Sequence, residues 1–129
     1  MSIKREASDK WFSDVVRLIA GYECEHCNRQ DGRMECAHIF GRAAKSVRWS
    51  LMNAVCLCHS CHRHFTSNPS EFTAWLDKFK GGQYMGILRE KWQVLMKTNK
   101  KLRADIAKHY REEHKKMVAS DSYEPVSYN

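Results

Sequence analysis

Two Cys-x-x-Cys pairs constrain the fold of this chain more than any other feature. One pair is Cys24-Glu-His-Cys27 and the other is Cys58-His-Ser-Cys61. Zinc prefers four thiolate or imidazole ligands in a tetrahedron, and a Cys-x-x-Cys turn supplies two of them from one tight bend. We therefore expect a structural Zn²⁺ held by all four cysteines, which we call the cysteine cluster.

Other interpretations of the cysteines fit less well. Disulfides belong to oxidising compartments, but the amino terminus lacks the apolar run of a signal peptide. A redox-active pair would sit in a thioredoxin-like strand and helix pattern, which neither pair has. The remaining alternative is that the cysteines are buried thiols that bind no metal. This alternative is weaker, because chance rarely produces two Cys-x-x-Cys pairs in one short chain. The other two cysteines, Cys36 and Cys56, fall on predicted strands and are expected in the core.

Length and composition bound the class of protein. A chain of 129 residues with 43% hydrophobic and 29% charged side chains predicts one folded domain, residues 1–129. The formal net charge of +7 favours a polyanionic partner such as nucleic acid, although basic small proteins are common. No segment approaches transmembrane length, so no membrane partner is expected. The expected location is intracellular, in the cytoplasm, which would be the host's if a phage encodes the chain.

Apolar periodicity and turn residues predict an α+β fold. A helix is expected over about residues 8–20, with its cap at Ser8-Asp9. Strands are expected at 34–40 and 54–57 on either side of a long loop, and a short helix should begin near Cys58.

These elements divide the chain into regions with different expected roles. The metal-bound core should cover 22–68, between the first helix and a helical part over 70–117. The last of these helices is strongly charged, and a solvated face is at least as good an interpretation there as a DNA contact. The terminal residues 118–129 are expected to form a loose tail.

Three polar residues associated with the cysteine pairs carry the candidate chemistry: His38, Asn53 and His62. Two strands followed by a helix would bring them to one crevice. Cleaving a phosphodiester there needs a general base for water, which suits His38, and a divalent cation such as Mg²⁺ or Mn²⁺, which His62 could bind. The Asn53 carbonyl could bind that cation or orient the base. Each residue alone would be interpreted as structural, and only their joint occurrence favours a site.

Several ordered segments also carry a resemblance to a known family. Asn53 followed by Leu-Cys-x-x-Cys-His looks like the HNH, or ββα-metal, nuclease motif. Residues 9 to about 95 resemble the phage NinG/Rap-type recombination endonucleases, through segments spread over roughly two thirds of the chain: Asp9-Lys-Trp-Phe-Ser13, Arg17-Leu18, Ala37-His38, Gly41-Arg42, Ser46-Val-Arg48-Trp49, the second cysteine pair and Asn68.

The resemblance implies a zinc-bound ββα-metal core and a structure-selective endonuclease acting on branched recombination intermediates such as Holliday junctions and D-loops. By position, His38 matches the general base, Asn53 the middle asparagine and His62 the metal-binding histidine. Ala37 stands where many members have a metal ligand, which implies fewer protein ligands for the cation and leaves loss of activity as an alternative. Some NinG-type members suggest His64 instead of His62 as the ligand.

Basic residues near these positions are candidates for contacts with DNA phosphates. Arg42, Lys45 and Arg48 lie in the loop between the strands, and Arg63 lies on the following helix. A homodimer meeting a DNA junction is compatible with this interpretation. The alternative function, from a different class, is a zinc-ribbon DNA-binding module without catalysis.

Overall fold

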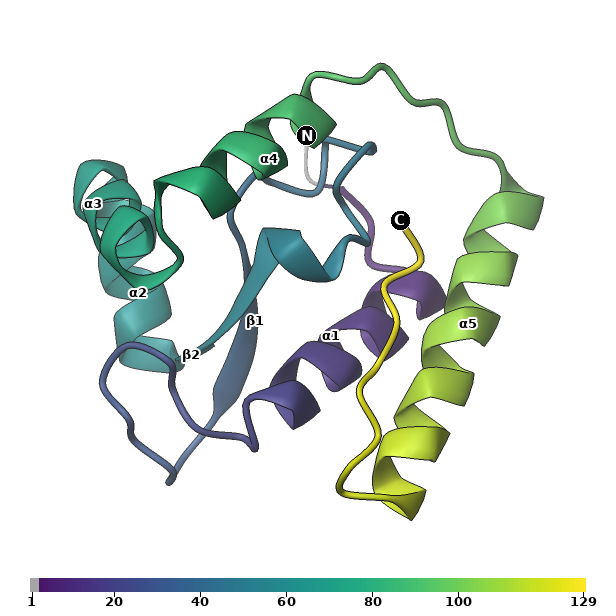
Figure 1. Cartoon of the computed structure of the whole chain (residues 1–129), viewed down its shortest axis with the longest axis horizontal. Helices are drawn as coiled ribbons and strands as arrows, with labels where there is room; N and C mark the ends of the chain where they lie inside the picture. Colours follow the sequence, from purple (N-terminus) through teal and green to yellow (C-terminus); the bar gives the residue numbers. More distant parts are fainter. Residues whose placement is uncertain (1–2) are drawn as a thin grey trace.

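An antiparallel pair of strands followed directly by a helix forms the centre of the protein (Figure 1). The structure is a computed structural model that describes residues 3–129. Strand β1 (Met34–His38) pairs with strand β2 (Ala54–Cys58), with Met34 opposite Cys58 and His38 opposite Ala54. Helix α2 (His59–Ser67) begins at the residue after β2, and the short 3-10 helix η1 (Leu51–Asn53) precedes that strand. Together with four further helices, this confirms the predicted α+β class.

Helix α1 (Ala7–Ile19) covers one side of the sheet and begins one residue before the predicted range. The predicted cap at Ser8-Asp9 is replaced by a capping box, in which the Glu6 side chain accepts from the Asp9 backbone and Asp9 accepts from the Glu6 backbone. Phe12 and Val15 on its apolar face are fully buried, whereas Ile19 at the end of the helix is half exposed.

Helices α3 (Pro69–Phe79) and α4 (Gly82–Trp92) lie on the other side of the sheet, next to α2. Gly81 connects them with a φ of 90°, a backbone conformation that favours glycine. Helix α4 ends at Trp92, so the predicted helical part over 70–117 is interrupted there, and Leu95 is almost completely exposed in the segment that follows.

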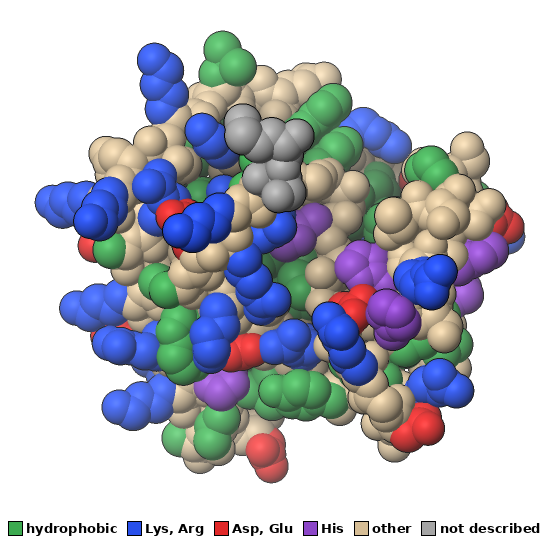
Figure 2. Space-filling model, turned by 180° about the vertical axis from the view of Figure 1, so that it is seen from behind, with side chains coloured by type: hydrophobic (Ala, Val, Ile, Leu, Met, Phe, Trp, Pro, Cys, Tyr) green, Lys and Arg blue, Asp and Glu red, His purple; other side chains and the backbone are tan. Residues whose placement is uncertain are grey.

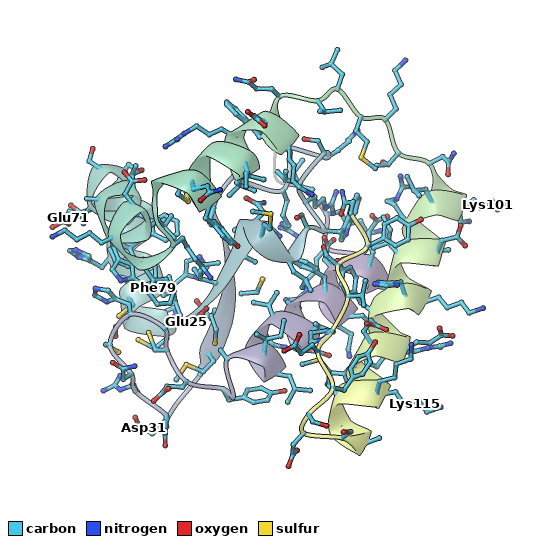
Figure 3. All side chains as sticks on the ribbon, in the orientation of Figure 1. Glu25, Asp31, Glu71, Phe79, Lys101 and Lys115 are labelled. Carbon is cyan, nitrogen blue, oxygen red and sulfur yellow. The ribbon has the colours of Figure 1, made fainter. Side chains whose placement is uncertain are left out.

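Helix α5 (Lys100–Ala119) packs along α1 and is capped by Asn99, whose side chain accepts from the Leu102 backbone. Lys101 and Lys115 point away from the rest of the molecule (Figure 3), as expected for a solvated face. Among the described residues, no helix is both long and apolar enough to cross a membrane.

The expectation of a loose carboxyl-terminal tail is wrong. Residues 120–129 fold back along α5 toward the sheet side of the molecule (Figure 1). The Glu113 carboxylate accepts from the Tyr123 hydroxyl and the Val126 backbone, and the Ser127 hydroxyl accepts from the Leu51 backbone. These buried or half-buried partners lie on α5 and in η1, so the hydrophobic pattern of the tail itself did not predict them.

The core is divided between the two sides of the sheet. One set of buried side chains lies between the sheet, α2, α3 and α4, and includes Ala37, Leu57 and Phe65. The second set lies between α1, α5 and the loop before β2, and includes Phe12 and Trp49. Because alternate strand residues face opposite sides, His38 and Cys36 face α1, whereas Glu35 and Ala37 face α2.

Candidate functional site

The four paired cysteines meet in one cluster. Their sulfur atoms all lie within 4.8 Å of one another, and Cys27 Sγ is 3.7 Å from Cys58 Sγ. Zinc–sulfur bonds of about 2.3 Å give a sulfur–sulfur edge of roughly 3.8 Å in a tetrahedron, so this spacing fits zinc. Sulfur atoms are visible between the 22–33 loop and the start of α2 in Figure 3.

Backbone hydrogen bonds shape both turns of the cysteine cluster. Cys27 N donates to Cys24 Sγ and Cys61 N donates to Cys58 Sγ, each at 3.5 Å. Burial opposes ionisation of Cys24, but backbone N–H groups of neighbouring residues lower the pKa of this thiol to about 7. Cys24 is therefore the thiol of the cluster that ionises most readily, whereas burial and the neighbouring sulfur atoms raise the pKa of Cys61.

The first turn is also joined to β2 through Glu25. Its backbone N–H donates to the Cys56 carbonyl at 2.9 Å, and its carboxylate accepts from the Cys56 N–H at 2.6 Å. Burial raises the pKa of Cys56 to about 11 and that of Cys36 to about 12, so both stay neutral thiols. Cys36 and Cys56 are therefore not part of the cluster, which consists of Cys24, Cys27, Cys58 and Cys61.

His38 ends β1 and is held in one tautomer. Its Nε2 lies 3.1 Å from the Arg48 carbonyl oxygen, and because a carbonyl only accepts, Nε2 must carry the proton. Nδ1 then keeps its lone pair, and burial against Phe12 lowers the pKa of the imidazole below its usual value. A neutral imidazole with a free lone pair can act as a general base.

Asn53 is completely buried and both ends of its amide are occupied. Oδ1 accepts from the Phe40 N–H and Nδ2 donates to the Phe40 carbonyl, each at 2.8 Å. Of the two expected roles, cation ligand or orienting group, these hydrogen bonds are compatible with the second, because they leave Oδ1 engaged with the backbone. The side chain fixes the turn that follows His38, and so helps to position the His38 side chain through the backbone.

His62 projects from α2 toward β1, where Glu35 holds it. Nδ1 of His62 lies 2.8 Å from Glu35 Oε1, and because a carboxylate only accepts, Nδ1 carries the proton. The remaining nitrogen, Nε2, is the one that can bind a cation. Burial alone would raise the pKa of Glu35, but hydrogen bonds from His62 and His59 lower it below its usual value.

His64, the alternative ligand, has a different environment. Its Nε2 lies 2.7 Å from the exposed Glu71 carboxylate of α3, and its Nδ1 lies 3.4 Å from Asn68 Nδ2. Both ring nitrogens are thus engaged at the surface, with the side chain 54% exposed. The geometry favours His62 over His64 as a ligand.

His38 and His62 line the same cavity of about 450 Å³, bounded by α1, β1 and the start of α2. The cavity wall carries a positive excess, because only two carboxylates face four arginines: Arg5, Arg17, Arg33 and Arg42. Figure 2 shows Lys and Arg side chains gathered over one side and the middle of this face of the molecule, with histidines beside them. A phosphate entering the cavity would meet positive charge next to both imidazoles.

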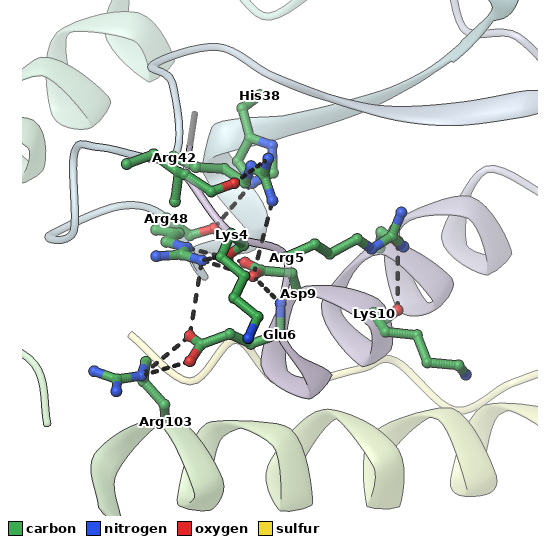
Figure 4. Close-up of polar contacts among 11 residues, drawn as sticks. Lys4, Arg5, Glu6, Asp9, Lys10, His38, Arg42, Arg48 and Arg103 are labelled. Atoms are coloured by element: carbon green, nitrogen blue, oxygen red, sulfur yellow. Dashed lines mark hydrogen bonds and ion pairs between the residues drawn. The ribbon is translucent and has the colours of Figure 1, made fainter. Parts of the chain in front are cut away.

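Arg48 does not have the environment of a DNA contact. It is buried, and its guanidinium binds both carboxylate oxygens of Asp9 at 2.9 and 2.6 Å (Figure 4). Burial opposes ionisation of Asp9, but the hydrogen bonds from Arg48 lower the pKa of its carboxyl below the usual value. Because Arg48 is buried and binds Asp9 through two hydrogen bonds, it is instead a structural link between the loop and α1.

The other three residues predicted to contact DNA, Arg42, Lys45 and Arg63, lie at different places on the surface. Arg42 lines the cavity beside His38. Lys45 is exposed on the loop and Arg63 is exposed on α2, where it borders a shallow surface with His59 and His64. Only Arg42, of the four predicted contacts, is among the residues that line the cavity.

Sequence reasoning missed two groups of residues at this site. Glu35 is two residues before Ala37 on the same strand face, and strand alternation could have indicated it. Arg5, Arg17 and Arg33 come from separate segments and meet only through the packing of α1 on β1, for which the sequence carries no local signal.

Comparison of the chain with protein-family models, curated proteins and solved structures finds no match. Within residues 3–129, the cysteine cluster is also the single group of three or more His, Cys, Asp or Glu ligand atoms close enough to hold an ion. A second cation at His62 would therefore depend on water and phosphate for most of its ligands.

Proposed function

We propose that this protein is a metal-dependent DNA endonuclease of the HNH type, a phosphodiester hydrolase whose general base is His38. The observation that carries the proposal is that His38 and His62 line one arginine-rich cavity, each with a different ring nitrogen free. His38 offers Nδ1 to take a proton, and His62 offers Nε2 to a cation. The cysteine cluster, as a structural zinc site, would fix β2 and α2 relative to the first turn.

The proposed reaction is hydrolysis with His38 as the proton acceptor. The scissile phosphate is bound by the cavity arginines, with Arg42 nearest in sequence to the base. Nδ1 of His38 removes a proton from water, the water oxygen attacks phosphorus, and the bond from phosphorus to the 3′ oxygen breaks. A divalent cation, Mg²⁺ or Mn²⁺, would neutralise charge on the phosphate and the leaving oxygen.

The proposed substrate is branched DNA of the kind that arises in recombination, such as junctions and D-loops. Support for this finer part comes from the resemblance to NinG/Rap-type endonucleases and from the charge of +7. The catalytic unit is contained in one chain, so a dimer would serve to engage two strands of a junction and not to complete the site.

Cleavage assays test the proposal. The zinc-loaded chain is incubated with duplex, flap, D-loop and four-way junction DNA under Mg²⁺, Mn²⁺ and Ni²⁺, beside His38→Ala, His62→Ala and the matched surface variant His64→Ala. We expect nicking by the wild type and His64→Ala, and a loss of at least about a hundredfold in His38→Ala.

Two results would overturn the proposal in different ways. Unchanged cleavage by His38→Ala would remove the assigned base. Junction binding by the wild type without nicking under any of the three cations would instead favour the zinc-ribbon DNA-binding module, for which the cysteine cluster alone suffices.

A further inference from the structure

A carboxylate that the proposed reaction does not use lies beside the cation-binding histidine. Glu35 is on β1, it is 15% exposed, and Oε1 accepts from His62 Nδ1 at 2.8 Å. Its other oxygen, Oε2, forms an ion pair with Arg33, whose Nε is 2.9 Å away, and lies 3.1 Å from His59 Nδ1. Three cationic or N–H groups therefore hold this carboxylate in place.

The position of Glu35 on the strand is informative. Residue 37, where a metal ligand is expected from the resemblance, is an alanine that is buried in the core against α2. Glu35 is two residues earlier, so its side chain emerges on the same face of β1 and toward the same helix. It is the single carboxylate of β1, and it reaches the imidazole of His62 instead of the cation position itself.

We propose that Glu35 is the positioning residue of the cation site, which fixes His62 in the tautomer that presents Nε2 to a divalent cation. This inference rests on the proposed function. Carboxylates that accept from the far nitrogen of a metal-binding histidine orient the ring and raise its basicity, and removing them typically lowers metal affinity by about 10–100-fold.

The chain contains a matched pair that lacks these features. Glu71 binds His64 at a similar distance, 2.7 Å, but both side chains are more than half exposed. That pair does not line the cavity. If removing any negative charge near α2 weakened Mn²⁺ binding, Glu71→Gln would weaken it too. If the effect acts through His62, Glu71→Gln should leave Mn²⁺ binding unchanged.

Mn²⁺ binding to the zinc-loaded full chain tests the inference, measured by the electron paramagnetic resonance signal of free Mn²⁺ and independent of any cleavage. We expect Glu35→Ala to weaken Mn²⁺ binding by about 10–100-fold and Glu35→Gln to weaken it less, because the amide oxygen still accepts from Nδ1. Glu71→Gln should bind as the wild type does. Zinc content and the thermal melting temperature of each variant report whether the fold is intact.

Cleavage kinetics add a second measurement on the same variants. The Mn²⁺ concentration for half-maximal cleavage should rise in Glu35→Ala, with much of the maximal rate restored at saturating Mn²⁺. Wild-type Mn²⁺ affinity in Glu35→Ala, or an equal loss in Glu71→Gln, would overturn the role of Glu35. Mn²⁺ binding that depends on Glu35 and His62, without cleavage of any DNA, would contradict the proposed endonuclease function but would still support the cation site.

Discussion

The Nε2–H of His38 donates to the backbone carbonyl of Arg48, and the two atoms are 3.1 Å apart. The same Arg48 binds Asp9 of α1 through its guanidinium, at 2.6 and 2.9 Å. One loop residue therefore sets the tautomer of the imidazole through its backbone and ties the loop to α1 through its side chain (Figure 4). The orientation of the proposed base depends on a buried ion pair whose second partner, Asp9, lies outside the ββα unit.

The pH dependence of cleavage should reflect the lowered pKa of the buried His38 imidazole. Burial lowers the pKa of this imidazole below its ordinary value of 6.5, and the neutral form is the one that accepts a proton. The rate should therefore persist as pH falls to 6.5 and decline only below it. Single-turnover cleavage at saturating Mn²⁺ over pH 5 to 8 measures this, with circular dichroism to verify folding. An acidic limb centred above pH 6.5 would contradict the assignment.

Asp9→Asn should destabilise the fold strongly. The substitution leaves the buried Arg48 guanidinium without its counter-charge, and breaking one side of a buried pair costs about 3–5 kcal/mol. Urea unfolding at pH 7 measures the loss. Asp31→Asn is the matched control, because Asp31 pairs with Arg29 at an exposed position where the cost is about 1 kcal/mol or less.

The same ion pair predicts a pH dependence of stability. The pKa of Asp9 is lower in the folded chain than its usual 3.8, so the stabilisation is present above that value and is lost as pH falls through the folded pKa. The difference between wild type and Asp9→Asn should shrink only below about pH 4. A difference that vanished nearer neutral pH would argue against the pair.

Asn53→Ala should separate positioning from metal binding. Removing the amide leaves the Phe40 N–H and carbonyl without their partners, which costs about 1–3 kcal/mol for each group that stays buried. Cleavage should fall because the turn after His38 loosens, whereas Mn²⁺ binding at His62 should be preserved. If Asn53→Ala abolished Mn²⁺ binding in a folded chain, Asn53 would be a ligand after all.

Features that depend on residues close together in the sequence could be predicted, whereas contacts between residues far apart in the sequence could not. The cysteine pairs, the first strand and the helix after Cys58 come from local patterns, and the structure confirms the α+β fold and the cysteine cluster. The first strand was predicted over 34–40 and is observed at Met34–His38. Arg48 was misread because its partner Asp9 lies 39 residues away, and nothing local to the loop signals an ion pair. The ordered tail was missed for the same reason, since its partners lie on α5 and before β2.

The cavity arginines should determine the salt dependence of DNA binding. Arg17→Gln and Arg42→Gln each remove one cation from the wall. For every phosphate that is no longer neutralised, the slope of log K against log salt should become shallower by about 0.9 for duplex DNA. Lys101→Gln, which changes a side chain pointing outward from α5, is the control. Fluorescence anisotropy at several salt concentrations measures the slopes, and equal slopes in all three variants would place the DNA elsewhere.

Removal of zinc should unfold the part of the chain that the cysteine cluster joins. Structural zinc sites of this type contribute about 10–16 kcal/mol of binding free energy that is available only when the ligands are brought together. Cys27→Ser is the informative variant, because Cys27 is exposed and its replacement disturbs little packing.

We expect Cys27→Ser to lose zinc and to melt at a much lower temperature, and chelation of the wild type to have the same effect. Cys56→Ala is the control, because Cys56 is a buried neutral thiol outside the cluster and its loss only leaves a small cavity. Zinc content by mass spectrometry together with thermal melts separates the two cases. Full zinc occupancy in Cys27→Ser would mean that a neighbouring group, such as His26 near Cys61 Sγ, replaces the thiolate as the fourth ligand.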